Sequence, residues 1–212
     1  GCNLENMPDS SLELLTNKEL ISLNQDPLGL QAYVAQHENE GYVLVKDIEQ
    51  KRGNVRAVAL YNPSDTICSF SVPFSSLEFG GNVKVRDLVK HSDLGNFSGT
   101  FEQTLPAHSA MFLRIEGETR LEPTLYEAEW AYLPLFNDLG KNPKGIIYAH
   151  DKEASGKMKV GFLGGQPENY AEWREVYSEN GGRYDMTIHY LYGKGRQIEL
   201  DVNGIITKID SL

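Results

Sequence analysis

Two carboxylates in the second half of the chain have a spacing that could bind a cation. Glu127 and Glu129 lie two positions apart in the segment YEAEW, which reads as a β-strand, so both side chains would point to one face. Neighbouring carboxylates repel each other unless a cation or water lies between them. Calcium takes about six to eight oxygen ligands, so the pair could form only part of a calcium site. A solvated strand face explains the same pattern.

Aromatic residues of the same region could bind a sugar. A ring can pack against the C–H face of a pyranose while a few polar groups meet its hydroxyls. Our candidate aromatic contacts are Tyr170, Trp173 and Tyr192, although Trp173 alternates with charged neighbours and is therefore expected to be buried. Asn203, in a turn after a strand, is the candidate polar contact.

The remaining reactive residue types form no recognisable site. The five histidines are scattered, and no nucleophile and base occur at a local spacing that suggests catalysis. The two cysteines, Cys2 and Cys68, are too few for a disulfide framework. We therefore assign no catalytic residue and consider an active site of the chain's own the weakest hypothesis.

The length of the chain indicates the number of domains, and its net charge limits the kinds of molecule it could bind. The chain has 212 residues, which favours two domains, and a net charge of −10 from 30 acidic and 20 basic residues. This charge argues against nucleic acid or an anionic membrane surface as partner, whereas neutral ligands remain open. No apolar run approaches the roughly 20 residues that a membrane-spanning helix requires, so we expect no membrane span.

The elements expected to position these residues are mainly strands. Leucines and isoleucines at near-helical spacing predict a helix over residues 9–23, ended by Pro27 and Gly29. Short alternating segments without intervening helices then predict an antiparallel sandwich. These segments are 42–47, 55–62, 67–72, 83–89, 99–105 and 110–115.

A second block of predicted strands follows a polar linker that closes with Pro123. In 184–192, apolar and polar side chains alternate as expected for a half-buried strand. Because five strands would leave open edges, we expect the block to be incomplete or completed from elsewhere. The five segments are 126–130, 159–164, 171–176, 184–192 and 197–204.

The first half of the chain resembles the melibiases, the α-galactosidases of glycoside hydrolase family 27. GCNLENM and LLTNKELISLNQDPLG resemble the end of that family's catalytic barrel, and Asn24 to Gly29 reproduce its exit turn. VALYNPS, VKVRDLV, LGNFSGTF and LPAHSAMFLRI resemble its C-terminal sandwich, whereas Asn3 and Glu5 depart from the usual Asp and Arg. The resemblance implies a retaining enzyme with two catalytic aspartates after barrel strands four and six. Both would precede Gly1.

The second half resembles the family 35 carbohydrate-binding modules. YEAE at 126–129, ASG at 154–156, GGRYDMTIHY and VNG at 202–204 occur in that family's order. This resemblance implies a jelly roll with a structural calcium held partly by Glu127 and Glu129. The family's further strands and a late Asp are missing after Leu212.

Together these observations predict a mainly β fold with two antiparallel β-sandwich domains in tandem, of Greek-key and jelly-roll type. A short N-terminal helix would be left over from a (β/α)8 barrel. The expected organisation is barrel remnant and exit turn 1–30, galactosidase sandwich 31–117, linker 118–124 and carbohydrate-binding jelly roll 125–212.

The expected function is that of a non-catalytic part of a secreted, periplasmic or cell-surface bacterial α-galactosidase. It would support the upstream barrel and bind galactosides or polysaccharides that contain uronic acid. The alternative is a purely structural module without sugar affinity.

Overall fold

The computed structural model describes residues 6–38, 40–49, 54–136, 145–155, 158–174, 176–191 and 197–209. The chain divides into two compact units, 1–180 and 181–212, each of which we consider by itself. The predicted linker at 118–124 lies inside the first unit, and the predicted domain boundaries stay predictions.

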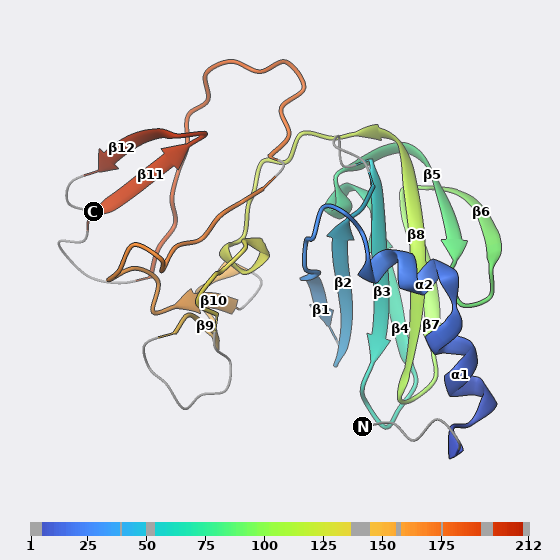
Figure 1. Cartoon of the computed structure of the whole chain (residues 1–212). Helices are drawn as coiled ribbons and strands as arrows, with labels where there is room; N and C mark the ends of the chain where they lie inside the picture. Colours follow the sequence, from blue (N-terminus) through green and yellow to red (C-terminus); the bar gives the residue numbers. More distant parts are fainter. Residues whose placement is uncertain are drawn as a thin grey trace. The chain divides into compact units, whose positions relative to one another are not determined.

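A two-layered antiparallel sandwich forms the body of the first unit (Figure 1). The larger sheet has the strand order β1-β2-β3-β8-β5-β6, and β4 pairs with β7 in the smaller one. The strands of the larger sheet are β1 (Tyr33–Glu38), β2 (Gly41–Asp47), β3 (Val55–Asn62), β8 (Ser109–Arg120), β5 (Phe79–Asp87) and β6 (Ser92–Ser98). The smaller sheet contains β4 (Cys68–Pro73) and β7 (Thr100–Leu105), and the short helix η2 (Phe74–Leu77) follows β4. This arrangement confirms the mainly β fold class and the sandwich predicted for the first half.

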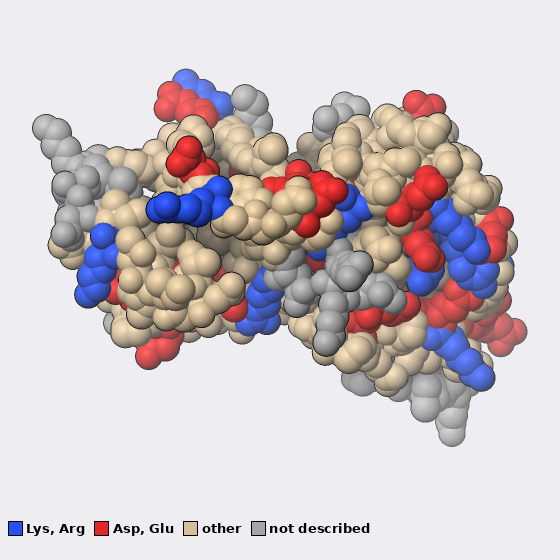
Figure 2. All heavy atoms as spheres, turned by 90° about the horizontal axis from the view of Figure 1, so that it is seen from above, with Lys and Arg blue, Asp and Glu red and all other residues tan. Residues whose placement is uncertain are grey.

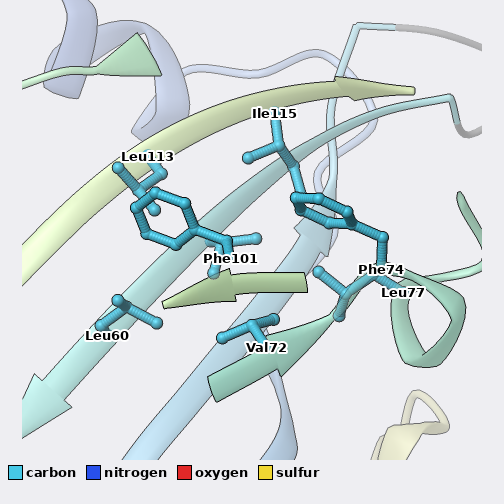
Figure 3. Close-up of a pocket in the computed structure, with 8 residues that line it drawn as sticks. Leu60, Val72, Phe74, Leu77, Phe101, Leu113 and Ile115 are labelled. Carbon is cyan, nitrogen blue, oxygen red and sulfur yellow. The ribbon is translucent and has the colours of Figure 1, made fainter. Parts of the chain in front are cut away.

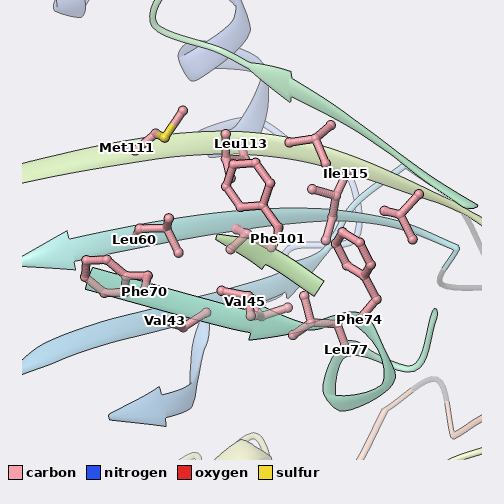
Figure 4. Close-up of a cluster of buried hydrophobic side chains, with 14 of the residues drawn as sticks. Val43, Val45, Leu60, Phe70, Phe74, Leu77, Phe101, Met111, Leu113 and Ile115 are labelled. Carbon is pink, nitrogen blue, oxygen red and sulfur yellow. The ribbon is translucent and has the colours of Figure 1, made fainter. Parts of the chain in front are cut away.

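The core lies between the two sheets and follows from alternation along the strands. In β4, Cys68, Phe70 and Val72 are buried while Ser69 and Ser71 between them are exposed, as a period of two requires. Figure 4 shows this cluster of apolar side chains. A gap of about 10 Å³ remains inside it, lined only by aliphatic and aromatic side chains (Figure 3). A space this small and apolar is a packing gap and not a ligand site.

The single helix predicted over residues 9–23 is two helices, α1 (Asp9–Thr16) and α2 (Lys18–Asn24). Asn17 separates them in an extended conformation, and its side-chain oxygen accepts hydrogen bonds from the amides of Glu19 and Leu20. Asparagine is among the preferred N-cap residues, because its oxygen satisfies amides that lack a partner in the first turn. A new helix therefore begins where the leucine spacing predicts continuation.

An arginine inside the sandwich is neutralised by one carboxylate from strand β2 and one from the turn after η2. Arg56 is 1% exposed; its Nε lies 2.7 Å from Asp47 Oδ1 and its Nη2 lies 2.9 Å from Glu78 Oε2. Nη1 donates to the carbonyl of Leu77 at 2.6 Å, and Arg120 Nη2 lies 2.8 Å from Glu78. The Nε and Oδ1 atoms are close but poorly aligned for a hydrogen bond, so charge attraction dominates their contact.

The rest of the first unit is less regular than predicted. The prediction of a strand at 126–130 is wrong, because Ala128–Trp130 form a 3-10 helix, η3. The expected strand at 171–176 is reduced, in its described part, to one backbone bridge between Tyr132 and Glu172. β9 (Ile147–His150) and β10 (Met158–Gly161) pair, and the latter overlaps the first half of the segment predicted at 159–164. Alternation indicates which face a strand would bury but does not supply the partner it needs.

The described part of the second unit contains one hairpin, β11 (Ile198–Val202) with β12 (Ile205–Ile209). Asn203 and Gly204 form its turn with positive φ angles of 52° and 88°, as a two-residue hairpin turn favours. The strand predicted at 184–192 is wrong over its described part, since 184–191 are neither helix nor strand and are exposed. No helix in the described part of the chain is long and apolar enough to cross a membrane.

We expect Arg56→Met to lower the free energy of unfolding by about 3–5 kcal/mol, because it leaves two acidic side chains without their buried partner. Urea unfolding measures this change. The matched control is Arg114→Met, which removes an arginine that pairs with Glu49 and Glu116 near the surface. We expect this control to lose less than about 1 kcal/mol. Equal losses for the two variants would contradict the importance given to the buried network.

Candidate functional site

The outer face of the six-stranded sheet carries the helix pair (Figure 1). Val55 and Ala57 of β3 point away from the sandwich core, and with Ile48 they form a small apolar cluster against which Leu23 of α2 packs. Lys46 of β2 donates from Nζ to the carbonyl of Leu23 at 2.8 Å. The end of α2 is therefore held on β2 and β3.

A polar network attaches the start of α2 to β5 and the turn after it. Arg86 donates from Nε and Nη2 to the two oxygens of Glu19, at 2.8 and 2.7 Å. His91 Nδ1 lies 2.7 Å from Glu19 Oε1, and Asn17 Nδ2 donates to the carbonyl of Leu88 at 2.9 Å. The hydrogen bonds from Arg86 hold the pKa of Glu19 at about 2, against the opposing effect of partial burial. Sequence reasoning missed this network, because nothing in the spacing links residues 67 positions apart.

Helix α1 has an apolar side that the sandwich leaves exposed. Leu12, Leu14 and Leu15 are all exposed, and Leu15 reaches 58%. Helices of folded proteins usually bury such apolar stripes, so these leucines are a candidate docking surface. The helix pair is thus fixed at one end and presents leucines at the other.

The two predicted cation ligands lie close together, although not on a strand. Ser155 Oγ donates to Glu127 Oε2 at 2.8 Å. Glu129 Oε1 is buried and has no hydrogen-bond partner in the described structure. Burial raises the pKa of Glu129, and the nearby charge of Glu127 adds to this effect. Among the described residues, no group of three or more His, Cys, Asp or Glu could hold a metal ion, so further ligands would have to be carbonyl, amide or water oxygens.

The predicted sugar contacts belong to both units. Trp173 is 40% exposed, so its predicted burial is wrong. The described part of its segment forms one backbone bridge, which is too little sheet to cover the ring on both faces. Its Nε1 donates to the carbonyl of Glu127 at 3.0 Å, which brings Trp173 next to the carboxylates. Tyr170 is also exposed in the first unit, Asn203 lies in the hairpin turn of the second, and Tyr192 lies outside the described residues.

Trp130 connects this region to the sandwich, which sequence reasoning also missed. Its indole Nε1 donates to the carbonyl of Val34 on edge strand β1 at 3.1 Å, and its ring lies 5.4 Å from that of Tyr33. The β1–β2 register shifts between Val34 and Gln36, so a β-bulge lies beside this contact. The tryptophan covers part of an edge that would otherwise present unpaired backbone groups.

The charged surface does not indicate a polyanion partner. Figure 2 shows acidic side chains interspersed with Lys and Arg on the face in view, without an extended basic patch among the described residues. Together with the net charge of −10, this distribution argues against binding of a phosphate backbone.

The sandwich is similar to a domain of known proteins. Residues 39–115 match the family described as the alpha galactosidase C-terminal beta sandwich domain. Alpha-galactosidase 3 of Arabidopsis thaliana is 37% identical over 111 residues, which are 51% of this chain and 25% of the relative. Alpha-galactosidase of Cyamopsis tetragonoloba is 32% identical over 111 residues, covering 51% of this chain and 26% of the relative. The chain thus spans about a quarter of the length of these relatives.

A solved structure shows the same fold. Alpha-galactosidase I from Mortierella vinacea superposes with a TM-score of 0.52 at 23% identity, covering 57% of this chain and 32% of that one. At this identity the likeness supports the fold alone.

We expect acid to loosen helix α2 through Glu19. A pKa lowered from 4.5 to about 2 means that the folded state binds the proton more weakly than the unfolded state does. The stabilisation from this group is complete above the unfolded value and is lost as the pH falls from about 5 towards 2. Thermal unfolding from pH 7 to pH 2 should show a smaller loss for Glu19→Gln than for the unchanged chain. Glu13→Gln on α1 is the control and should follow the unchanged chain; identical curves for all three proteins would refute the role of Glu19.

Proposed function

We propose that residues 39–115, which match the alpha galactosidase C-terminal beta sandwich domain family, support an alpha-galactosidase catalytic domain without taking part in its chemistry. The observation that carries this proposal is the fixed helix pair on the outer face of the sheet. Leu23 and the Glu19–Arg86 ion pair hold α2 in place, whereas the leucines of α1 are uncovered.

The proposed partner of the leucines is a catalytic (β/α)8 barrel of the same protein. In such a barrel the outer helices bury their apolar stripes against the strands, so α1 would join that ring of helices. The barrel would supply both catalytic aspartates, after its fourth and sixth strands, and no residue of this chain is assigned to bond cleavage. Secretion, or placement in the periplasm or at the cell surface, is part of the same proposal.

For residues 125–212 we propose carbohydrate binding. The supporting observations are the exposed rings of Tyr170 and Trp173 and the turn position of Asn203, with Tyr192 as a further candidate. The chemistry suits a galactoside, because aromatic rings pack against the apolar face of galactose. Polysaccharides that contain uronic acid are the second ligand class, disfavoured by the net negative charge of the chain. Binding near the catalytic domain would raise the local concentration of substrate.

Calcium is the proposed structural cofactor of this region. Glu127 and Glu129 fit as two of its oxygen ligands. The buried oxygen of Glu129 has no hydrogen-bond donor, and the two negative charges repel each other, so a cation would stabilise both. When bound, calcium would neutralise both charges and stabilise the turn around η3. A purely structural module without sugar affinity is the alternative outcome of the tests below.

The 212-residue chain should not hydrolyse an aryl α-galactoside at a rate above the uncatalysed one. Release of the coloured phenol from p-nitrophenyl α-galactoside measures this directly. Turnover that copurifies with the chain through two different columns would contradict the proposed support role.

Calcium should raise the unfolding temperature of the chain. Saturation at about 100 times the dissociation constant corresponds to about 2.7 kcal/mol of stabilisation. Differential scanning calorimetry with calcium, with magnesium and with chelator measures the shift. Glu129→Gln should abolish it, whereas Glu153→Gln, an exposed carboxylate in the same region, should leave it unchanged. No shift in the unchanged chain would rule out the calcium proposal.

A further inference from the structure

The loop after β10 holds an aromatic residue in an unfavourable backbone conformation. Phe162 has a φ angle of +61°, in the left-handed region, and its side chain is 59% exposed. Bulky residues avoid this region because Cβ approaches the following carbonyl oxygen. Such strain persists only where the surrounding structure enforces it, and it clusters at binding sites. Most of the Phe162 side chain is exposed, so burial offsets little of this strain.

Asn169 is the residue that enforces this conformation. It is 6% exposed, and its Nδ2 donates to the carbonyls of Phe162 at 2.9 Å and Gly164 at 2.8 Å. The amide of Gly164 in turn donates to the carbonyl of Asn169 at 3.2 Å. These hydrogen bonds close residues 162–169 into a loop whose two ends lie side by side.

The clamp leaves a second unfavourable feature in the loop. Both partners of the Asn169 amide are carbonyls, so Nδ2 and Oδ1 cannot be interchanged. Oδ1 is buried and has no hydrogen-bond partner in the described structure. A buried polar atom without a partner destabilises a fold. The positive φ of Phe162 and the unpartnered Oδ1 of Asn169 both cost stability. Both occur in the loop that presents the exposed phenyl ring.

The surroundings of the ring suit a flat, uncharged ligand. Tyr170 follows the clamp directly and is exposed, so aromatic side chains stand at both ends of the closed loop. Between them, Gly164 and Gly165 have positive φ angles and open space where side chains would lie. Glu168 is the one charged residue in 161–170. Arg174 lies near enough to Tyr170 to interact with it electrostatically, but its guanidinium is already paired with Glu172 at 2.8 Å.

We infer that Phe162 is a sugar-stacking residue and that the loop 162–170 binds a neutral pyranose, with Asn169 as the positioning residue. The C–H face of the sugar would pack on the phenyl ring, with the Tyr170 ring as a second contact. This inference rests on the carbohydrate binding proposed for residues 125–212. It adds a binding residue and restricts the ligand to neutral glycans.

Phe162→Gly provides the sharpest test, because glycine adopts a positive φ without strain. The variant should keep or raise the unfolding temperature while its affinity for galactomannan, a neutral polysaccharide that bears galactose, falls roughly three- to tenfold. Isothermal titration calorimetry measures the affinity. Leu125→Ala, at an exposed apolar residue outside the loop, is the matched control and should bind as the unchanged chain does.

The outcomes separate the site from the function on which it rests. Unchanged affinity in Phe162→Gly, with measurable binding by the unchanged chain, would overturn the site and leave the proposed carbohydrate binding intact. A lower unfolding temperature in this variant would show that the ring has a structural role and would also overturn the site. No binding of galactomannan or methyl α-galactoside by the unchanged chain would overturn the carbohydrate-binding proposal itself. Tighter binding of polygalacturonate than of galactomannan would overturn the restriction to neutral glycans.

Discussion

The buried charge of Arg56 is the constraint on which the sandwich depends. A guanidinium removed from water must be neutralised and hydrogen-bonded, or the fold loses several kcal/mol. Arg56 on β3 therefore requires Asp47 on β2 and the turn at Leu77 and Glu78 to lie around it. Glu78 also pairs with Arg120 at the end of β8, so this cluster determines where four segments of the chain meet. The apolar core provides most of the stability, but it does not specify this meeting point.

Ion pairs and hydrogen bonds also attach the flanking segments to the sandwich. A few directional contacts decide the position of each, since neither segment buries a large apolar area against the sheet. Glu19 with Arg86 places α2 on the outer face, and Trp130 with Val34 covers the edge of β1. The sandwich thus acts as a frame with one attached helix pair and one attached carbohydrate-binding candidate. The proposed support role requires that α2 shares the stability of the sandwich.

Sequence reasoning predicted the sandwich because alternation and turn residues are local signals. β3, with its predicted range of 55–62, is recovered to the residue, whereas edge strand β6 is absent from the expected segments because its side chains are mostly exposed. The same alternation failed at 184–191, where no described strand lies alongside to complete a ladder. Phe162 was not predicted as a site residue, because its backbone angle depends on a hydrogen bond from Asn169; the pair Gly164–Gly165 was the available signal.

The most direct test of the account is native-state amide hydrogen exchange on the intact chain. If α2 is part of the frame, the amides of Ile21 to Asn24 should open with a free energy close to that of β3 and β8. Residues 184–191, which have no backbone ladder, should exchange nearly without protection. Exchange of the α2 amides as fast as that of 184–191 would show that the helix is not held on the sheet, and the support role would fail with it.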